Sequence, residues 1–262
     1  MVLLAAQSGA AGIDFVRDGT VVRHLDDAAL ARTCALETVE VDDPYYESRK
    51  RYRACPLVSL LTAGFGMAPD QLGAEDVLFH ALDGYVKPSS LARITEAGGF
   101  VAFQDADRPV GFAPLGRRGL DPGPFYIVWT KPAQRDVHRY PWPYQLAAIE
   151  LTSVAKKFPH TVPQGVPAHA PAWRGYDVFR TDCIACHSIN GEGGTVGPDL
   201  NVPRAIVEYR PAAQLKAYIR NPAAFRYGNM PAHDYLTPAD LDGLMAYFGA
   251  MKERKHDPGG RP

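Results

Sequence analysis

Short apolar segments separated by turn signals make up the first part of the chain. Residues 13–16 and 20–25 flank Asp18-Gly19, a pair typical of β-hairpin turns. Apolar and polar side chains alternate over residues 36–41, as on a half-buried strand. The other strand candidates are residues 77–82, 100–103, 125–129 and 144–151. This pattern predicts an α+β or mostly β domain over residues 1–152.

Two short helices interrupt these strand candidates, and a proline-rich segment follows them. One helix is expected after the cap Asp26-Asp27, and the other over residues 56–61 with proline in its first turn. Residues 153–171 carry a proline about every four positions, which neither a helix nor a central strand tolerates. We therefore expect an extended interdomain linker there.

Helical periodicity dominates the rest of the sequence. Helices are expected over residues 173–181 and 212–219. The last helix begins with Thr237 as N-cap, Pro238 in the first helical position and Asp240 two residues later. Its apolar face is formed by Leu241, Leu244, Met245 and Phe248.

Composition narrows the class of protein. The chain has 262 residues, of which 46% are hydrophobic, enough for one large domain or two ordinary ones. Its formal net charge is −1, so no basic field favours nucleic acid as a partner. No apolar run reaches the roughly 18 residues that a membrane span needs. Residues 1–12 are apolar and small but lack a basic start, so a truncated signal peptide and a simple N-terminal arm both stay open.

The candidate chemistry lies in Cys183-Ile184-Ala185-Cys186-His187, the C-x-x-C-H haem attachment sequence. Two thiols three positions apart lie on one helical turn, so each can add to a vinyl group at the same porphyrin edge. The adjacent imidazole of His187 is then presented to the iron. We expect one covalent haem c in a C-terminal electron-transfer domain.

Two other interpretations of the cysteine pair remain possible at this point. A zinc half-site needs two further ligands at suitable spacing, and the sequence has no second C-x-x-C. A redox-active dithiol of the thioredoxin type needs a βαβ setting, whereas this pair lies in helical sequence.

A second axial ligand is expected in a loop rich in glycine and proline. Met230 follows Gly228 and precedes Pro231, a setting unusual for a core methionine. A thioether ligand stabilises ferrous iron and raises the reduction potential. His233 competes with Met230 for this role, and we favour Met230. Tyr227, in the same loop, is expected to lie at the cofactor as well.

Residues 172–262 resemble the class I cytochromes c. Gly175 and Tyr176 match positions of that family's N-terminal helix that pack on the C-terminal helix. Tyr247 and Phe248 supply the aromatic counterpart. The resemblance implies an all-α domain.

The loop after the haem motif, residues 191–200, is also similar to that family. In the family, the carbonyl of the residue matching Pro198 accepts the Nδ1 proton of the histidine matching His187, which orients the ligand. Two further stretches resemble the family before and at the distal ligand, namely residues 219–222 and 229–231. The resemblance implies that His187 and Met230 bind the iron and that Cys183, Cys186 and Pro198 complete the haem site.

Residues 1–152 resemble, more loosely, a truncated sulfite-oxidase-type molybdopterin fold. The similarity is one of pattern, carried by residues 41–46, 51–57, 83–85, 101–103 and 142–151. The enzymes of that family need a longer cofactor-binding region and a cysteine thiolate on molybdenum. Cys34 and Cys55 are the sole candidates and neither has the family's ligand context, so we expect no bound pterin. A disulfide between them and two separate thiols both stay open.

These observations favour a periplasmic electron carrier. Its expected partner is a redox protein or a larger electron-transfer complex, with the N-terminal domain used for docking or assembly. A six-coordinate iron leaves no open position for a substrate, which favours this role over the alternatives. The alternatives are an enzyme whose N-terminal domain oxidises a small substrate and passes electrons to the haem, and a haem-based ligand sensor.

Overall fold

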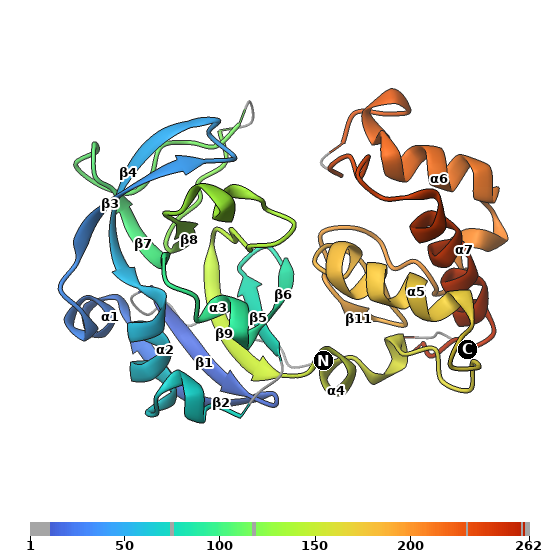
Figure 1. The fold of residues 1–262 in the computed structure, drawn as a ribbon, viewed down its shortest axis with the longest axis horizontal. Coiled ribbons are helices and arrows are strands. Elements are labelled where there is room, and N and C mark those ends of the chain that lie inside the picture. The colour runs from blue at the N-terminus through green and yellow to red at the C-terminus, as the bar shows by residue number, and fades with distance from the viewer. Residues whose placement is uncertain (1–10, 74–75, 117–118, 229, 258, 260–262) are drawn as a thin grey trace. The chain divides into compact units, whose positions relative to one another are not determined.

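Two units emerge from the computed structural model, which describes residues 11–73, 76–116, 119–228, 230–257 and 259 (Figure 1). The first unit comprises the chain up to Leu82 together with Ser89–Ser153. The second comprises Val154–Pro262 and a short segment from the N-terminal half, Asp83–Pro88. For residues 1–12 the sequence left a truncated signal peptide and an N-terminal arm open. Residues 1–10 of this segment lie outside the described residues.

Strands dominate the N-terminal half, as the alternating pattern predicts. They are β1 (Gly12–Arg17), β2 (Thr20–Asp26), β3 (Glu37–Asp43), β4 (Ser48–Pro56), β5 (Asp76–Ala81), β6 (Val86–Ser90), β7 (Gly99–Asp105), β8 (Tyr126–Trp129) and β9 (Leu146–Thr152). The helices are α1 (Asp27–Thr33), α2 (Leu57–Phe65), α3 (Leu91–Ile94), η1 (Pro69–Gln71) and η2 (Pro132–Arg135). The prediction of a mostly β region with short helices is confirmed.

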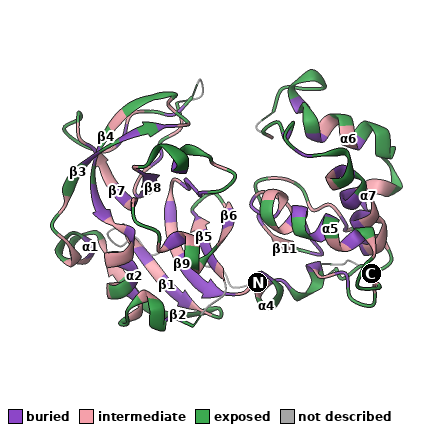
Figure 2. Ribbon diagram, in the orientation of Figure 1, coloured by how far each residue is buried: buried purple, intermediate pink, exposed green. Residues whose placement is uncertain are grey.

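One sheet has the strand order β2-β1-β9-β5-β6. The hairpin of β1 and β2 turns at Asp18 and Gly19, both with positive φ, as the Asp-Gly pair predicts. β9 pairs in parallel with β1 and antiparallel with β5, so the end of the N-terminal half closes onto its beginning. Buried residues follow β1 and β9 in Figure 2, and the side chains of Phe15 and Ile149 are fully buried there.

The other sheet has the order β3-β4-β7-β8 and is antiparallel throughout. Its interior includes a buried carboxylate, Asp43, which accepts hydrogen bonds from the hydroxyls of Tyr52 (2.9 Å) and Tyr126 (3.0 Å). Burial raises the pKa of Tyr126 well above its ordinary value, and the Asp43 carboxylate adds to this effect. Both hydroxyls therefore stay protonated and donate to the Asp43 carboxylate, which would be costly to bury without hydrogen-bond partners.

Two strands of the N-terminal half were missed by the strand prediction. β4 begins with several charged residues, and its buried apolar residues lie only toward its end, so it lacks a long alternating apolar pattern. β6 contains a proline and only a few apolar residues. Pro56 lies one residue before α2 rather than inside it.

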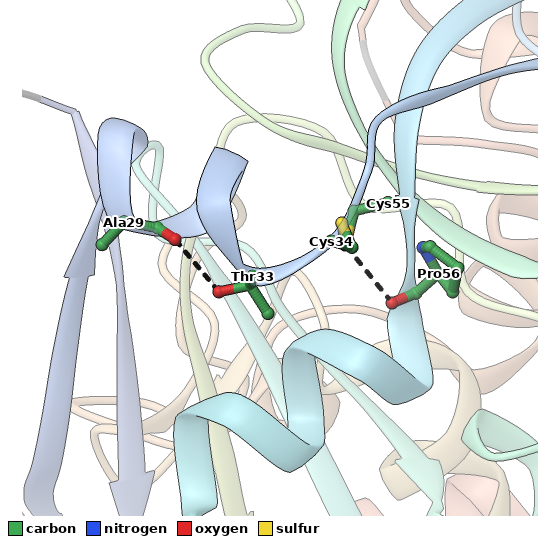
Figure 3. The surroundings of a disulfide bond; sticks show 5 residues. All are labelled: Ala29, Thr33, Cys34, Cys55 and Pro56. Carbon is green, nitrogen blue, oxygen red and sulfur yellow. Dashed lines mark hydrogen bonds between the residues drawn. A yellow bond between two sulfur atoms is a disulfide. The ribbon is translucent and has the colours of Figure 1, made fainter.

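A disulfide joins Cys34, just after α1, to Cys55 in β4 (Figure 3). The Cα atoms lie 6.0 Å apart and the two residues are separated by 21 positions. The alternative of two separate thiols is therefore wrong. The sequence had left the pairing open, because the spacing of two cysteines does not specify whether their side chains meet.

Helices dominate the second unit. Its elements are α4 (Val154–Lys157), η3 (Pro159–Thr161), α5 (Pro171–Val178), the π-helical turn η4 (Phe179–Cys183), β10 (Ser188–Ile189), β11 (Glu192–Gly193), η5 (Ile206–Glu208), α6 (Ala212–Arg220), η6 (Pro222–Ala224) and α7 (Pro238–Lys252). The strands β10 and β11 form a small antiparallel pair, so the unit is not strictly all-α. The predicted cap of α7 is confirmed, since Thr237 Oγ1 accepts from the Asp240 amide and Asp240 Oδ2 accepts from the Thr237 amide.

The helices α5 and α7 cross at two glycines. An added Cβ at Gly175 would lie 2.0 Å from the carbonyl oxygen of Gly243, so neither backbone leaves room for a larger residue. Tyr176 and Tyr247 pack beside this crossing, with ring centroids 5.8 Å apart. The expected contact between the helix before the haem motif and the last helix is therefore present.

The proline-rich segment differs from the extended linker that we expected. It contains α4 and η3 and, from Val154 onward, belongs to the second unit. Two of its prolines, Pro159 and Pro171, begin helices, where a missing amide hydrogen is harmless. The carbonyl of the buried Thr161 accepts a hydrogen bond from Tyr247 Oη at 2.6 Å, which fastens the segment to α7.

Among the described residues, no helix combines the length and the apolar character that crossing a membrane requires.

Candidate haem-attachment site

The two cysteines of the C-x-x-C-H motif lie on a single helical turn that continues α5 and η4. The amides of Cys186 and His187 both donate to the Cys183 carbonyl, at 3.1 and 2.9 Å. Both cysteines are free thiols in a chain whose other two cysteines form a disulfide. Their position on one turn is the geometry that attachment to one porphyrin edge requires.

Burial keeps the two thiols protonated. It raises the pKa of Cys183 to about 12 and also raises the pKa of Cys186. Nearby carboxylates act in the same direction, Asp182 on Cys183 and Asp83 on Cys186. Both thiols are therefore in their protonated form in this structure.

His187 is held in one orientation by the loop that follows it. Its Nδ1 donates to the carbonyl oxygen of Pro198 at 2.8 Å, as the resemblance implies, so Nε2 is the nitrogen that carries a lone pair. A Cβ at Gly197 would lie 2.5 Å from Cε1 of the His187 ring, so only glycine permits this close approach. Burial lowers the pKa of His187, which favours the neutral imidazole that binds metals.

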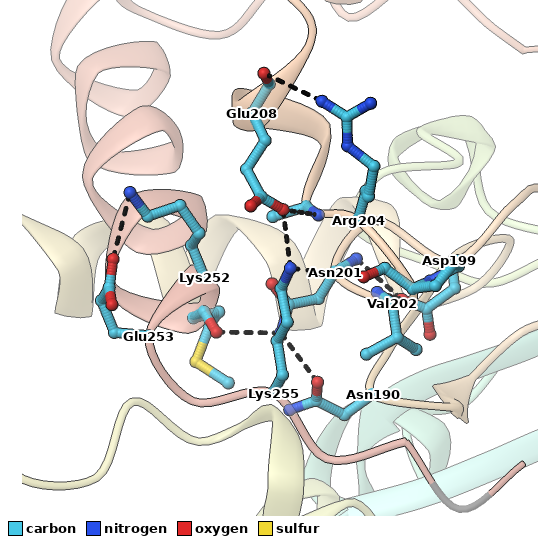
Figure 4. Close-up of polar contacts among 12 residues, drawn as sticks. Asn190, Asp199, Asn201, Val202, Arg204, Glu208, Lys252, Glu253 and Lys255 are labelled. Carbon is cyan, nitrogen blue, oxygen red and sulfur yellow. Dashed lines mark hydrogen bonds and ion pairs between the residues drawn. The ribbon is translucent and has the colours of Figure 1, made fainter. Parts of the chain in front are cut away.

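Asp199 fixes the loop that carries the Pro198 carbonyl (Figure 4). Its carboxylate accepts hydrogen bonds from the amides of Asn201 (2.7 Å), Val202 (2.8 Å) and Gly191 (2.7 Å). These bonds determine the backbone course directly after Pro198. The sequence analysis had not singled out this role, although an aspartate followed by turn residues is a known signal for such a loop.

Two buried asparagines tie this loop to the end of α7. Nδ2 of Asn201 donates to Asn190 Oδ1 at 2.7 Å and to the Met251 carbonyl at 2.9 Å. Nδ2 of Asn190 in turn donates to the Arg254 carbonyl at 2.9 Å. The loop that orients His187 is thereby anchored to the last helix.

The remaining predicted site residues lie in the loop between η6 and α7. Met230 is half-buried, whereas the side chain of Tyr227 is 99% exposed, so packing within the chain does not hold Tyr227 at any site. His233 is buried, its Nδ1 donates to the Pro231 carbonyl at 3.0 Å, and it lies close enough to His187 to lower the pKa of that residue. The roles of Met230 and Tyr227 at a cofactor stay predictions.

A segment that the sequence analysis did not connect with the site packs against the haem-attachment turn. This strap, Asp83–Pro88, is part of the second unit. The Val86 amide donates to the Ala185 carbonyl at 2.9 Å, and the Gly84 carbonyl accepts from the Thr195 amide at 3.1 Å. The first bond reaches the residue between the two cysteines, so the strap lies directly on the motif.

The Cytochrome c family model matches residues 172–252. This part of the chain is a cytochrome c domain. A cytochrome c domain implies a covalently bound haem c, and the residues described above fit one: two free thiols on one turn, and a neutral histidine whose Nδ1 is already engaged. The match does not include the N-terminal half, for which the sulfite-oxidase-like resemblance stays a prediction.

Two relatives are similar to the chain over a comparable length. "Cytochrome c oxidase subunit 2" of Alkalihalophilus pseudofirmus is 32% identical over 93 residues, which are 33% of this chain and 27% of that protein. "Thiosulfate dehydrogenase" of Thiomonas intermedia is 36% identical over 99 residues, which are 35% of this chain and 30% of that protein. The chain thus spans less than a third of the length of the relatives it matches.

Proposed function

We propose that the protein is a mono-haem electron carrier in which Cys183 and Cys186 hold the haem covalently and His187 binds the iron. When bound, the haem supplies one iron that gains or loses a single electron. The observation that carries the proposal is the pairing of two thiols on one turn with an imidazole whose Nδ1 is bonded to Pro198. The chain's own residues orient the ligand and keep its donor nitrogen deprotonated.

The main test is to purify the exported protein and record its mass and visible spectrum. We expect a Soret band, a mass increment of one haem per chain that survives denaturation, and reversible one-electron reduction. A colourless protein at the mass of the bare polypeptide would contradict the proposal. Tight carbon monoxide binding by the reduced form would favour the sensor alternative, because it requires an iron position that is open or whose ligand is readily displaced.

We propose Met230 as the second iron ligand, with His233 as its competitor. Met230→Ala is expected to retain covalent haem, to change the visible spectrum and to lower the reduction potential, because a thioether favours ferrous iron. His233→Ala is the matched control in the same loop and is expected to leave the spectrum unchanged. The reverse pattern in optical titrations of the two variants would assign the ligand to His233.

The proposed compartment is the periplasm. The Cys34–Cys55 disulfide supports an oxidising compartment, since such bonds are rare in the cytosol. Covalent attachment to thiols supports the same setting. Fractionation of the native host is the direct test, and recovery of the haem-bearing protein in the cytosol would contradict this part of the proposal.

The first unit is proposed to serve in docking or assembly with a redox enzyme or a respiratory complex. Both of its cysteines are engaged in the disulfide, so in this state neither offers a thiolate to molybdenum. The Thiomonas relative is named as a dehydrogenase, which favours the alternative in which this chain is itself an enzyme. Metal and pterin analysis of the purified protein separates the two, since the enzyme alternative requires a second redox centre besides haem iron.

A further inference from the structure

Lys87, in the strap Asp83–Pro88, is buried against the haem-attachment turn. Its side chain belongs to a residue only 8% exposed, and Nζ donates to the Thr181 carbonyl at 2.9 Å. Thr181 lies two positions before Cys183, while Lys87 is 94 positions away from Thr181 in sequence. Because the strap's backbone is bonded to the same turn through Ala185, the ammonium is fixed beside the two thiols.

The positive charge of Lys87 acts on both attachment residues. It lowers the pKa of Cys183 and of Cys186, against the opposing effects of burial and of the neighbouring carboxylates. Burial lowers the pKa of Lys87 itself, and the carboxylate of Asp182 counteracts that effect. A cation and two carboxylates, Asp83 and Asp182, therefore meet at the place where haem is to be attached.

A charge fixed at this place acts on the redox equilibrium. Oxidation of the iron adds one positive charge, which a nearby ammonium in a poorly solvated setting disfavours. Carboxylates at the same place have the opposite effect. Buried charges are screened less by salt than surface charges, so the effect persists at physiological ionic strength.

We propose that Lys87 raises the reduction potential of the haem and that the N-terminal half of the sequence thereby sets the potential of the cytochrome c domain. The inference rests on the proposed function, because it requires a haem on Cys183 and Cys186. It assigns to the strap a role beyond packing: a substitution far from the cytochrome c domain in sequence changes the driving force for electron transfer.

The test is a redox titration of the full chain with its haem, followed by visible spectroscopy. Lys87→Gln keeps a donor for the Thr181 carbonyl but removes the charge. We expect the equilibrium constant for reduction to fall about tenfold, which corresponds to about 59 mV for one electron. Lys87→Arg keeps the charge and is expected to stay close to the unsubstituted protein.

Lys252→Gln is the matched control, because Lys252 lies in the same unit and pairs with Glu253 at the surface. It is expected to leave the potential unchanged. A covalent-haem Lys87→Gln protein with the original potential would overturn the proposal, as would a Lys87→Arg protein that falls as far as Lys87→Gln, since packing would then be the cause.

A second variant tests the same electrostatic effect on the reduction potential if the Lys87→Gln protein does not accumulate. Asp83→Asn removes a carboxylate that acts on Cys186, and we expect it to raise the potential. An unchanged potential in Asp83→Asn would count against charge at this position as a determinant. Lack of covalent haem in the unsubstituted protein is a different result, because it contradicts the proposed function itself.

Discussion

A protein in which Cys183 and Cys186 are both replaced by alanine is expected to carry no covalent haem. In the proposed site each thiol forms one thioether bond with the haem, and both thiols lie on the turn that also carries His187. Without them, only the axial ligands remain to hold a cofactor, and a noncovalent haem is lost on denaturation. Haem staining of a denaturing gel and intact mass measure the effect directly.

The chain supplies its own control in its second cysteine pair. Replacing Cys34 and Cys55 by alanine removes the disulfide of the first unit and is expected to leave covalent haem intact. Opening a loop of 21 positions costs the first unit about 3 kcal/mol by the chain-entropy relation. Covalent haem in the Cys183/Cys186 double variant would show that the motif is not the attachment site.

Features set by neighbouring residues could be predicted from the sequence. The haem motif, the Asp18-Gly19 hairpin and the Thr237 cap each depend on side chains a few positions apart, and each has the predicted geometry. The hydrogen bond from His187 to Pro198 was implied by resemblance, and it too spans only 11 positions. Local stereochemistry suffices for such features, because the interacting groups are brought together by the chain itself.

Features that join distant parts of the chain could not be predicted. Lys87 meets Thr181 across 94 positions, and the local signals in its strap, an Asp-Gly turn and a proline, are compatible with many partners. The Cys34–Cys55 bond was one of two open alternatives for the same reason. Asp199 and Asn201 combine both kinds of contact. The hydrogen bond from the Asn201 amide to the Asp199 carboxylate is local, whereas the bond from the Asn201 side chain to the Met251 carbonyl joins distant parts of the chain.

At the crossing of α5 and α7, one residue could be predicted from the sequence and its partner could not. Gly175 could be assigned to a helix contact by resemblance, whereas Gly243 on the opposing helix gave no signal. A glycine inside a helix is usually a weakness of about 1 kcal/mol relative to alanine. Its presence at Gly243 is explained only when the opposing backbone is known, since an added Cβ there would lie 3.0 Å from the Gly175 amide nitrogen.

Gly175→Ala is accordingly expected to destabilise the second unit by about 2 kcal/mol in the free energy of unfolding. The new Cβ would lie 2.0 Å from the Gly243 carbonyl oxygen and 2.6 Å from the Tyr247 Cβ, and these backbone-proximal atoms cannot rotate away. The helices must separate, at a cost that outweighs alanine's higher helix propensity. Separation also strains the turn into Cys183, because η4 directly continues α5.

Gly249→Ala is the matched control on α7, because an added Cβ there meets nothing within 4 Å. This variant is expected to be more stable than the original protein by up to about 1 kcal/mol, since only the helix propensity changes. Denaturant unfolding followed by the Soret band compares the two variants within the same unit. If Gly175→Ala is as stable as the original protein, the close crossing does not determine the stability of the second unit. If the two glycine variants change the free energy of unfolding in opposite directions, it does.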